Sequence, residues 1–176
     1  MGTWTILKEI ARLRTNWVTL VGEEWLCDKG KNLEYWRVEK VDSVIVLPIY
    51  KSHFLICKPT FRPGVGRHTI DFPGGRVPNG KAPEDIAPLI IERELGIPAA
   101  SINSLKTINN SKRDINSSFS NQGLGAFVAI INDSVDISLS SQYNYTVDTA
   151  GITALLNDLE CLQCRSVLLE WNFYNT

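Results

Sequence analysis

Residues 58–97 of the 176-residue chain decide the fold, and they read KPTFRPGVGRHTIDFPGGRVPNGKAPEDIAPLIIERELGI. A short strand is expected over residues 69–72, where the chain reaches a Pro-Gly-Gly turn. A helix is expected over residues 83–95, because Pro83 suits the first helical position and Gly96 suits the position just past the end. This stretch therefore predicts a strand that leads through a turn into a helix.

Dense apolar runs on either side of this stretch predict the rest of a sheet. Residues 44–49, 54–57 and 124–131 are short and almost wholly apolar, which is typical of buried strands. A final helix is expected over residues 149–160, with Asp148 as its N-terminal cap. Central apolar strands mixed with helices predict an α/β layered domain.

The N-terminal part of the chain has a different pattern. An amphipathic helix is expected over residues 4–14, where apolar side chains recur at helical spacing. Residues 16–27 and 33–40 are expected to form the two strands of a hairpin. These elements make a module of residues 1–42 that is too small to be stable alone. The main domain then spans residues 43–176.

Charge and composition exclude several classes of protein. The chain carries 18 Lys and Arg against 19 Asp and Glu, a net charge of −1, so we expect no general attraction to nucleic acid or to an anionic membrane. No apolar run approaches the roughly 20 residues of a membrane helix. The N-terminal residues lack the pattern of a signal peptide, and the sequence therefore predicts a cytoplasmic protein.

The four cysteines do not require an oxidising compartment. Cys27 and Cys57 lie in apolar stretches and are expected to be buried thiols. Cys161 and Cys164 form one C-x-x-C pair, which is half of a zinc site with no second pair at a suitable spacing. We expect them to be two positions near the end of a helix, and metal or redox use of the pair stays an open alternative.

The stretch from Lys58 to Ile97 resembles the core of the Nudix hydrolases of the ADP-ribose and ADP-sugar pyrophosphatase type. In that family an R-P-G loop and an acidic-x-Pro-Gly strand end lead into the Nudix box. Placing the first glycine of the box at Gly75 puts Gly96 and Ile97 at its closing positions without a gap. The resemblance covers about residues 16–131. It implies the Nudix fold, an α/β/α sandwich with a mixed β-sheet, here with an N-terminal helix and β-hairpin module.

The Nudix box implies hydrolysis of a diphosphate with Mg²⁺ or Mn²⁺ held by glutamates on one helix face. In this sequence the three matching positions are Ile90, Arg93 and Glu94, so one carboxylate remains. The resemblance thus implies Glu94 as the catalytic remnant, and Glu94 with Gly74 as the remaining metal contacts. Two further positions of the box, an upstream glutamate and a bracing arginine, are occupied here by Lys81 and Leu89.

Other acids do not restore the missing set. The late loop over residues 115–123 contains no acid, although the family often places a glutamate there. Glu92 is expected to face away from the metal-binding face, and Glu84 and Asp85 suit the first turn, where acids complement the helix dipole. Pro88 is expected to kink the helix or to cost about 3 kcal/mol. A site rebuilt from displaced carboxylates stays open as an alternative.

The binding residues of the family are better preserved. Trp17 and Trp36 match two tryptophans from different subunits that sandwich adenine, and Arg62 matches an arginine that contacts the nucleotide. The alternatives are that both tryptophans pack the N-terminal module and that Arg62 is an exposed loop arginine. The ligand-binding set is completed by Gly74, Gly75 and Arg93.

Arg93 places a cation on the helix face where family members hold a metal. The resemblance therefore suggests that it contacts a diphosphate directly and replaces the charge of the metal. The alternatives are an ion pair with Glu94 or Asp71, or simple exposure to solvent.

The resemblance implies a homodimer in which residues 1–42 form a dimerisation and base-binding arm. It further implies a nucleotide-sugar binder that is impaired or inactive in metal-dependent diphosphate hydrolysis and that uses Mg²⁺ or Mn²⁺ if active and otherwise no cofactor. Two alternatives stay open. One is an active Mg²⁺-dependent pyrophosphohydrolase with displaced carboxylates, and the other is a ligand-sensing or scaffold protein.

Overall fold

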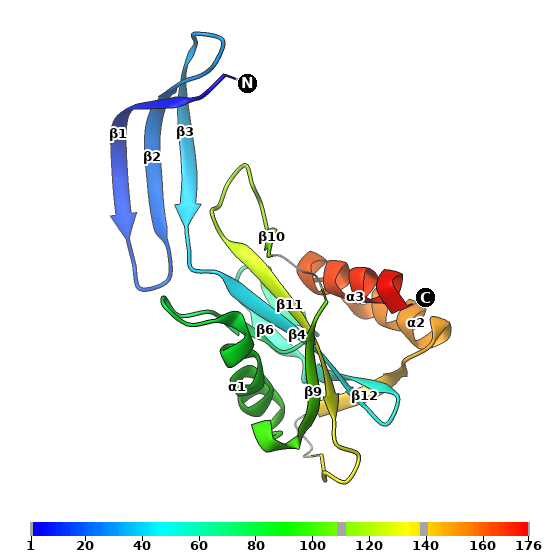
Figure 1. Cartoon of the computed structure of the whole chain (residues 1–176). Coiled ribbons are helices and arrows are strands. Elements are labelled where there is room, and N and C mark those ends of the chain that lie inside the picture. Colours follow the sequence, from blue (N-terminus) through cyan, green and yellow to red (C-terminus); the bar gives the residue numbers. More distant parts are fainter. Residues whose placement is uncertain (1, 109–111, 138–140, 176) are drawn as a thin grey trace. The chain divides into compact units, whose positions relative to one another are not determined.

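The computed structural model of the protein describes residues 2–108, 112–137 and 141–175 (Figure 1). Within these ranges, each helix is too short or too polar to cross a membrane. The chain divides into two compact units, which we call the N-terminal unit and the main unit. The N-terminal unit comprises Met1–Asp42 and Asp114–Gly123, and the main unit comprises Ser43–Arg113 and Leu124–Thr176. Residues 114–123 thus lie with the N-terminal strands, whereas the sequence analysis placed them in the domain of residues 43–176.

The N-terminal unit is a three-stranded antiparallel sheet in the order β1-β2-β3. The strands are β1 (Thr5–Arg14), β2 (Thr19–Leu26) and β3 (Asn32–Glu39). Strands β2 and β3 confirm the predicted hairpin. Part of the late loop completes the unit, since Val38 N–H donates to the carbonyl oxygen of Phe119 at 2.7 Å.

The helix predicted over residues 4–14 is wrong, because this segment forms the edge strand β1. Its pairing with β2 shifts register between Ile6 and Lys8 and again between Glu9 and Ala11. Each bulge adds a residue to one strand, so the apolar residues do not follow the two-residue alternation of a regular strand. The spacing of the apolar residues therefore resembles that of a helix. The backbone of this segment nevertheless pairs with β2 as a strand.

The main unit is built on a mixed sheet in the order β10-β11-β4-β5-β12, with β8 also paired to β4 and β9 to β11. Strands β4 and β11 are parallel to each other. Strands β5 and β8 pair antiparallel with β4, β9 pairs antiparallel with β11, and β12 pairs antiparallel with β5. The strands of this sheet are β4 (Ser43–Tyr50), β5 (His53–Cys57), β8 (Gly74–Arg76), β9 (Ile102–Thr107), β10 (Arg113–Asp114), β11 (Gly123–Ile131) and β12 (Ser141–Thr146). The strands expected over residues 44–49, 54–57 and 124–131 are therefore confirmed.

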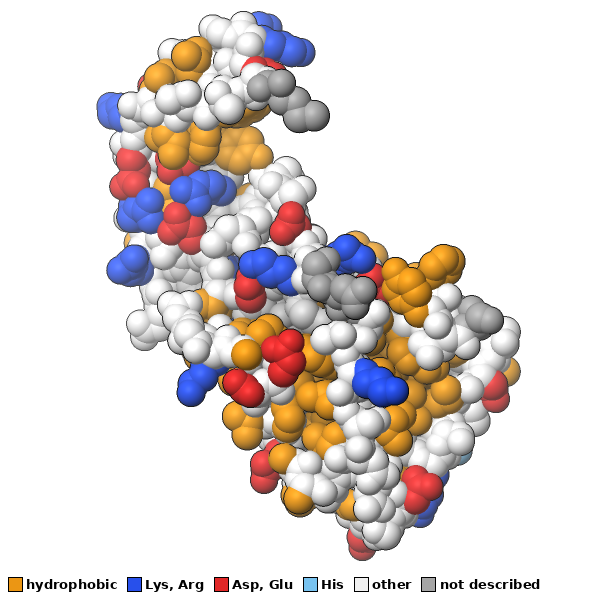
Figure 2. Space-filling view, in the orientation of Figure 1, with side chains coloured by type: hydrophobic (Ala, Val, Ile, Leu, Met, Phe, Trp, Pro, Cys, Tyr) orange, Lys and Arg blue, Asp and Glu red, His pale blue; other side chains and the backbone are white. Residues whose placement is uncertain are grey.

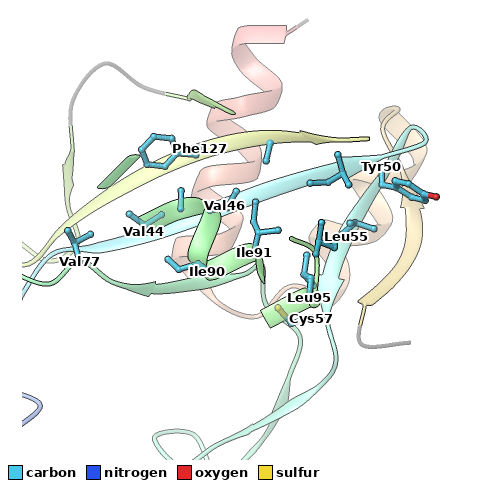
Figure 3. Packing of buried hydrophobic residues seen from close by; sticks show 14 residues of the cluster. Val44, Val46, Tyr50, Leu55, Cys57, Val77, Ile90, Ile91, Leu95 and Phe127 are labelled. Carbon is cyan, nitrogen blue, oxygen red and sulfur yellow. The ribbon is translucent and has the colours of Figure 1, made fainter. Parts of the chain in front are cut away.

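Helices lie on both faces of this sheet. On one face, Val44 and Val46 pack with Ile90 and Ile91 of α1 (Pro83–Leu95) in the main apolar cluster (Figure 3). On the other face, Phe54 makes an edge-on ring contact with Trp171 of α3 (Leu162–Asn175), with ring centroids 5.4 Å apart. This is the predicted α/β/α sandwich with a mixed sheet.

The helix limits follow from local chemistry. Helix α1 begins at Pro83 and ends before Gly96, which adopts the left-handed conformation at φ 69° and donates its N–H to the carbonyl oxygen of Glu92. It runs as one helix through Pro88. Helix α2 (Thr149–Asp158) is capped by Asp148, whose carboxylate accepts from Gly151 N–H at 2.8 Å. Both helices were predicted from these capping residues.

The strand expected over residues 69–72 is displaced. A small hairpin of β6 (Thr60–Arg62) and β7 (Arg67–Thr69) precedes that position. The following backbone is joined to the sheet by two isolated hydrogen bonds, from Val46 N–H to Pro73 and from Cys57 N–H to Asp71. These two hydrogen bonds therefore hold the backbone before β8 against the sheet, although residues 70–73 do not form a regular strand.

Candidate functional site

The glycines of β8 lie directly against helix α1. Strand β8 pairs with β4 through Gly75 and Val44. A Cβ atom on Gly75 would lie 2.9 Å from Arg93 Nη2 and 3.1 Å from the Ile90 side chain, distances that real side chains do not tolerate without a shift. A side chain at residue 75 would therefore require both Arg93 and Ile90 to shift if the strand is to stay this close to the helix.

Arg93 joins the strand to the helix at this point. Its Nη2 donates to the carbonyl oxygen of Gly74 at 3.0 Å, and its Nε donates to Glu94 Oε1 at 2.8 Å. The Arg93 side chain is still 59% exposed. The guanidinium thus contacts both groups that the resemblance assigned to a metal, and it also faces solvent.

The residues around Glu94 do not fit a hard divalent cation. Such an ion takes several oxygen ligands, but Ile90 is 1% exposed within the apolar cluster and Leu89 is an exposed leucine. The Glu94 carboxylate is already paired with a guanidinium. Glu84, Asp85 and Glu92 lie on the exposed side of α1, so no rebuilt carboxylate set is found among the described residues of the helix.

Arg62 at the end of β6 is held by Asp71. Its Nε and Nη2 donate to Asp71 Oδ2 at 2.9 and 2.6 Å, and Thr69 Oγ1 donates to the same oxygen at 3.1 Å. Asp71 is 8% exposed, whereas the Arg62 side chain is 49% exposed. The carboxylate therefore orients a guanidinium that remains open to solvent.

The two arginines act on the same region of the main unit. Burial, together with the charges of Glu94 and Asp71, raises the pKa of the Cys57 thiol to about 12, against the opposing effect of Arg62 and Arg93. All four charges thus act on one buried atom at the end of β5. Arg93, Glu94, Gly74 and Gly75 thus lie together where β8 meets α1, and Arg62 is held by Asp71 at the end of β6.

Trp36 belongs to the N-terminal unit and packs partly against its own sheet. A Cβ on Gly22, its cross-strand partner, would lie 2.7 Å from the tip of the Trp36 ring. Its Nε1 donates to Glu34 Oε1 at 2.7 Å, and the residue is 40% exposed. The ring therefore covers Gly22 with one part and presents another part to solvent.

Trp17 lies in the turn between β1 and β2. Thr15 Oγ1 accepts from the N–H groups of Trp17 and Val18 at 3.1 and 3.0 Å, which fixes the backbone of the turn. Trp17 is 69% exposed. An indole held out on an ordered turn is suited to stacking on a flat ligand.

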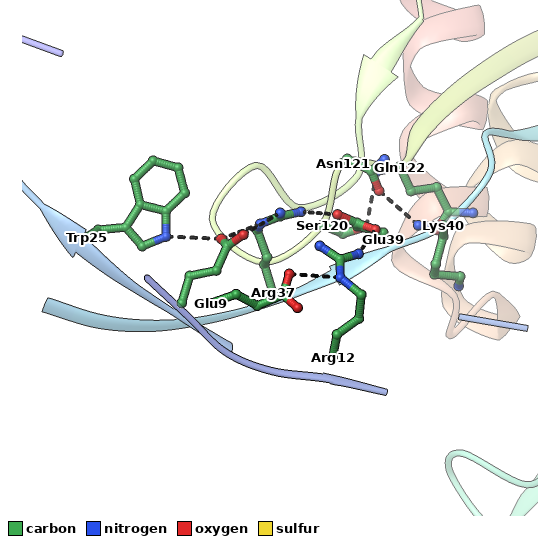
Figure 4. Close-up of polar contacts among 10 residues, drawn as sticks. Glu9, Arg12, Trp25, Arg37, Glu39, Lys40, Ser120, Asn121 and Gln122 are labelled. Atoms are coloured by element: carbon green, nitrogen blue, oxygen red, sulfur yellow. Dashed lines mark hydrogen bonds and ion pairs between the residues drawn. The ribbon is translucent and has the colours of Figure 1, made fainter. Parts of the chain in front are cut away.

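The sequence analysis missed a polar network in the N-terminal unit (Figure 4). Arg37 donates to both carboxylate oxygens of Glu23 at 3.0 Å and to Glu39 at 2.9 Å. Arg12 also donates to Glu39, and Trp25 Nε1 donates to Glu23. Glu23 is 3% exposed, and the hydrogen bond from Arg37 lowers its pKa despite burial. The sequence contains a signal for this network, because charged residues recur at matching positions of the two paired strands.

A second cluster contains the C-x-x-C pair, for which the sequence left metal or redox use open. One carboxylate oxygen of Asp71 and the sulfur atoms of Cys161 and Cys164 all lie within 4.8 Å of one another. Cys164 is buried and Cys161 is half-buried. The C-x-x-C spacing was visible, but the partner from residue 71 depends on the tertiary fold.

The chain is similar to a curated Nudix hydrolase and to solved structures. No protein-family model matches the chain. An uncharacterized Nudix hydrolase of Schizosaccharomyces pombe is 29% identical over 105 residues, which is 53% of this chain and 51% of that protein. The matched region thus spans about half the length of this curated relative. The crystal structure of an ADP compounds hydrolase is similar with a TM-score of 0.77 and 16% identity, covering 99% of this chain and 95% of that chain.

Proposed function

We propose that this chain, which has the Nudix fold of the ADP-ribose pyrophosphatase type, binds a nucleotide sugar such as an ADP-sugar through fixed arginines and is impaired in metal-dependent hydrolysis. The observation that carries the proposal is the guanidinium of Arg93, bound between the Gly74 carbonyl and the Glu94 carboxylate. A permanent cation lies where the family uses a metal ion.

Arg93 has the chemistry to bind a diphosphate without a metal. A guanidinium has five N–H donors and keeps its charge at all ordinary pH values. The two contacts of Arg93 use two of these donors, and its side chain is 59% exposed. Phosphate oxygens can therefore reach the remaining donors and form charge-assisted hydrogen bonds.

Arg62 supplies the second cation. Asp71 holds its guanidinium in one orientation, which lowers the entropy lost when a ligand binds. Two oriented guanidiniums near the end of β5 suit the two phosphates of a nucleotide sugar. Gly74 and Gly75 carry no side chain that would block the approach of the ligand.

Hydrolysis needs more than this arrangement supplies. A divalent cation would neutralise the phosphates and lower the pKa of the attacking water. The described residues around Glu94 offer one carboxylate, and Arg93 is already bound to it. Retained recognition with weak or absent hydrolysis is therefore the function that this chemistry supports, and an active Mg²⁺-dependent or Mn²⁺-dependent enzyme is the alternative outcome of the test.

The base of the ligand is proposed to stack on Trp17 and Trp36 in a homodimer formed through the N-terminal unit. Strand β1 is exposed over its whole length and carries Ile6, Leu7, Ile10 and Leu13. Figure 2 shows apolar side chains on the surface of this unit. A second copy would cover these side chains, and β1 is an unpaired sheet edge. Four free thiols suit the reducing cytoplasm, which we propose as its location.

The test is a thermal-shift screen of ADP-ribose and other nucleotide sugars in EDTA, repeated with Mg²⁺ and with Mn²⁺. A ligand at 100 times its Kd should stabilise the chain by about 2.7 kcal/mol, with no added effect of the metal. Binding that occurs only with Mg²⁺ contradicts the arginine mechanism. Release of AMP above the level of a Glu94→Gln variant establishes the active enzyme, and no shift with any nucleotide sugar leaves a scaffold role.

A further inference from the structure

The C-x-x-C pair lies at the start of a long helix that the proposed function does not use. Helix α3 spans Leu162–Asn175, and Cys161 immediately precedes it. The carbonyl oxygen of Cys161 accepts from Arg165 N–H at 3.0 Å, so Cys161 is the N-terminal cap residue. Cys164 lies in the first turn, and spacing of three residues puts both side chains on the same side of the helix.

The two thiols differ in access to solvent. Cys164 is 2% exposed, whereas Cys161 is half-buried and reachable. Their sulfur atoms lie within 4.8 Å of each other. One accessible thiol beside one buried thiol is the arrangement in which an external group reacts first with one sulfur and is then displaced by the other.

The buried carboxylate of Asp71 contacts the thiol of Cys164. Cys164 Sγ donates to Asp71 Oδ1 at 3.9 Å. The other oxygen, Oδ2, is held by Arg62 and Thr69, so Oδ1 is kept turned toward the thiol. Asp71 is therefore positioned to take the proton that Cys164 must lose before it can attack.

The environment of the outer thiol favours the thiolate. The adjacent Cys164 side chain, together with the N–H groups of Cys164 and Gln163, lowers the pKa of Cys161 to about 6, against the opposing effects of burial and of the Asp71 charge. The same sulfur–sulfur contact and burial raise the pKa of Cys164. The pair thus separates into a reactive sulfur and a protonated one at neutral pH.

We propose that Cys161 and Cys164 form a redox-active dithiol that exchanges with low-molecular-weight disulfides, with Cys161 as the attacking thiol and Cys164 as the resolving thiol. The Cys161 thiolate attacks one sulfur of the small disulfide, whose S–S bond breaks and releases one thiolate. The result is a mixed disulfide on Cys161.

Cys164 completes the reaction. Its proton passes to Asp71 Oδ1, and its sulfur attacks Cys161 Sγ, which breaks the mixed disulfide and releases the second small thiolate. The protein loses two electrons and two thiol protons, and the small disulfide becomes two thiols once the released thiolates are protonated. The Cys161–Cys164 bond that forms is then open to reduction by excess small thiol in the reverse direction.

A bound metal ion explains the cluster less well. Asp71, Cys161 and Cys164 offer three groups, one fewer than the four protein ligands of a closed zinc site. The Asp71 carboxylate is also already paired with the guanidinium of Arg62. The difference in exposure between the two sulfurs is a feature of exchange chemistry and has no role in metal binding.

The experiment uses the full chain, reduced, treated with EDTA and then incubated with glutathione disulfide at pH 7. Mass spectrometry should find an intramolecular disulfide that joins Cys161 to Cys164. In Cys164→Ser, one glutathione should remain trapped on Cys161, and in Cys161→Ser, Cys164 should remain a thiol. Cys27→Ser and Cys57→Ser are matched controls that should leave the exchange unchanged.

The pH dependence of Cys161 alkylation in the unaltered chain tests the proposal even if the variants fail to fold. The rate of Cys161 alkylation by iodoacetamide should rise with a midpoint near pH 6, the value that the site gives this thiol. A midpoint near the ordinary thiol value of about 8.5 overturns the proposal. So does glutathione addition at Cys27 or Cys57 in place of Cys161, or stoichiometric zinc that must be removed before the pair reacts.

Discussion

The guanidinium of Arg93 donates to the carbonyl oxygen of Gly74 across a distance of 3.0 Å, and this contact ties helix α1 to strand β8. The same side chain pairs with Glu94, so one arginine engages the two oxygen groups that the resemblance assigns to a metal. A fixed cation differs from a metal in one measurable respect, because a chelator cannot remove it. The affinity for a diphosphate ligand should therefore depend on residue 93 and be independent of divalent ions.

Replacing Arg93 with alanine should weaken ADP-ribose binding about 10- to 100-fold, as expected for the loss of charged hydrogen bonds of about 1.5–3 kcal/mol. Isothermal titration calorimetry in EDTA measures the change. Arg113→Ala is the matched control, because Arg113 is comparably exposed, at 56%, and also pairs with an acid, Glu170. Equal affinities for the Arg93 and Arg113 variants would remove Arg93 from the binding site.

Exchanging the cation for an acid should create a dependence on divalent metal ions, which we propose is absent from the natural chain. In Arg93→Glu, a second carboxylate stands beside Glu94 and the Gly74 carbonyl, all of them oxygen ligands that Mg²⁺ and Mn²⁺ accept. We expect Mn²⁺ to raise the Tm of this variant and to leave the Tm of the natural chain unchanged. The same Mn²⁺-dependent shift in both proteins would mean that the natural chain already holds a metal.

Gly75→Ala tests the close approach of β8 to α1. The added methyl group would lie 2.9 Å from Arg93 Nη2 and 3.1 Å from Ile90, so the arginine must move. We expect a loss of stability of about 1–3 kcal/mol together with weaker ligand binding. Gly64→Ala is the control, since nothing lies within 4 Å of its Cβ position. Unchanged ligand affinity in Gly75→Ala would show that ligand binding does not depend on the position of the Arg93 guanidinium.

Two charges on β1 should dissociate the proposed homodimer. Ile10 and Leu13 are 44% and 63% exposed, so lysine at both positions places charge on the surface that a second copy would cover. Light scattering coupled to size exclusion should report a monomer for the Ile10→Lys, Leu13→Lys double variant and a dimer for the natural chain. A natural chain that is already monomeric at micromolar concentration contradicts the proposed arm.

Most of the fold was predictable from short-range chemistry. The proline and glycine at the ends of α1 and the Asp148 cap of α2 each act within one turn of the chain, so sequence was sufficient to place them. Strand β1 was not predictable in the same way, because its two bulges exist only in pairing with β2. Helix α3 was missed for a related reason, since its buried face is defined by contacts such as that of Trp171 with Phe54.

In the candidate site too, local sequence was enough to predict some features, and others depend on tertiary contacts. The family pattern was enough to locate Arg93 and Glu94, and the pairing of these two residues was one of the alternatives considered. The contact with the Gly74 carbonyl depends on how β8 lies against α1, which no local pattern specifies. Asp71 is a stronger case, because it joins Arg62, nine residues before it, to Cys164, 93 residues after it in the chain.

The stability of the N-terminal unit should depend on pH through Glu23. The pKa of Glu23 is lowered from its ordinary 4.5 chiefly by the hydrogen bond from Arg37. A carboxyl group with a lowered folded-state pKa stabilises the fold above its ordinary value, and this contribution is lost as the pH falls through the lowered value. Tryptophan fluorescence reports mainly on this unit, which contains four of the five tryptophans. Urea unfolding should therefore show decreasing stability below about pH 4.5.

Arg37→Met should make the buried Glu23 carboxylate destabilising at neutral pH, because it leaves this carboxylate without its main partner. We expect a loss of about 2 kcal/mol at pH 7, which shrinks at pH 4 because Glu23 can then take up a proton. Glu9→Gln removes a more exposed pair with Arg12 and should change little at either pH, since exposed ion pairs contribute little. A loss in Arg37→Met that stays constant with pH would mean that the arginine acts through packing alone.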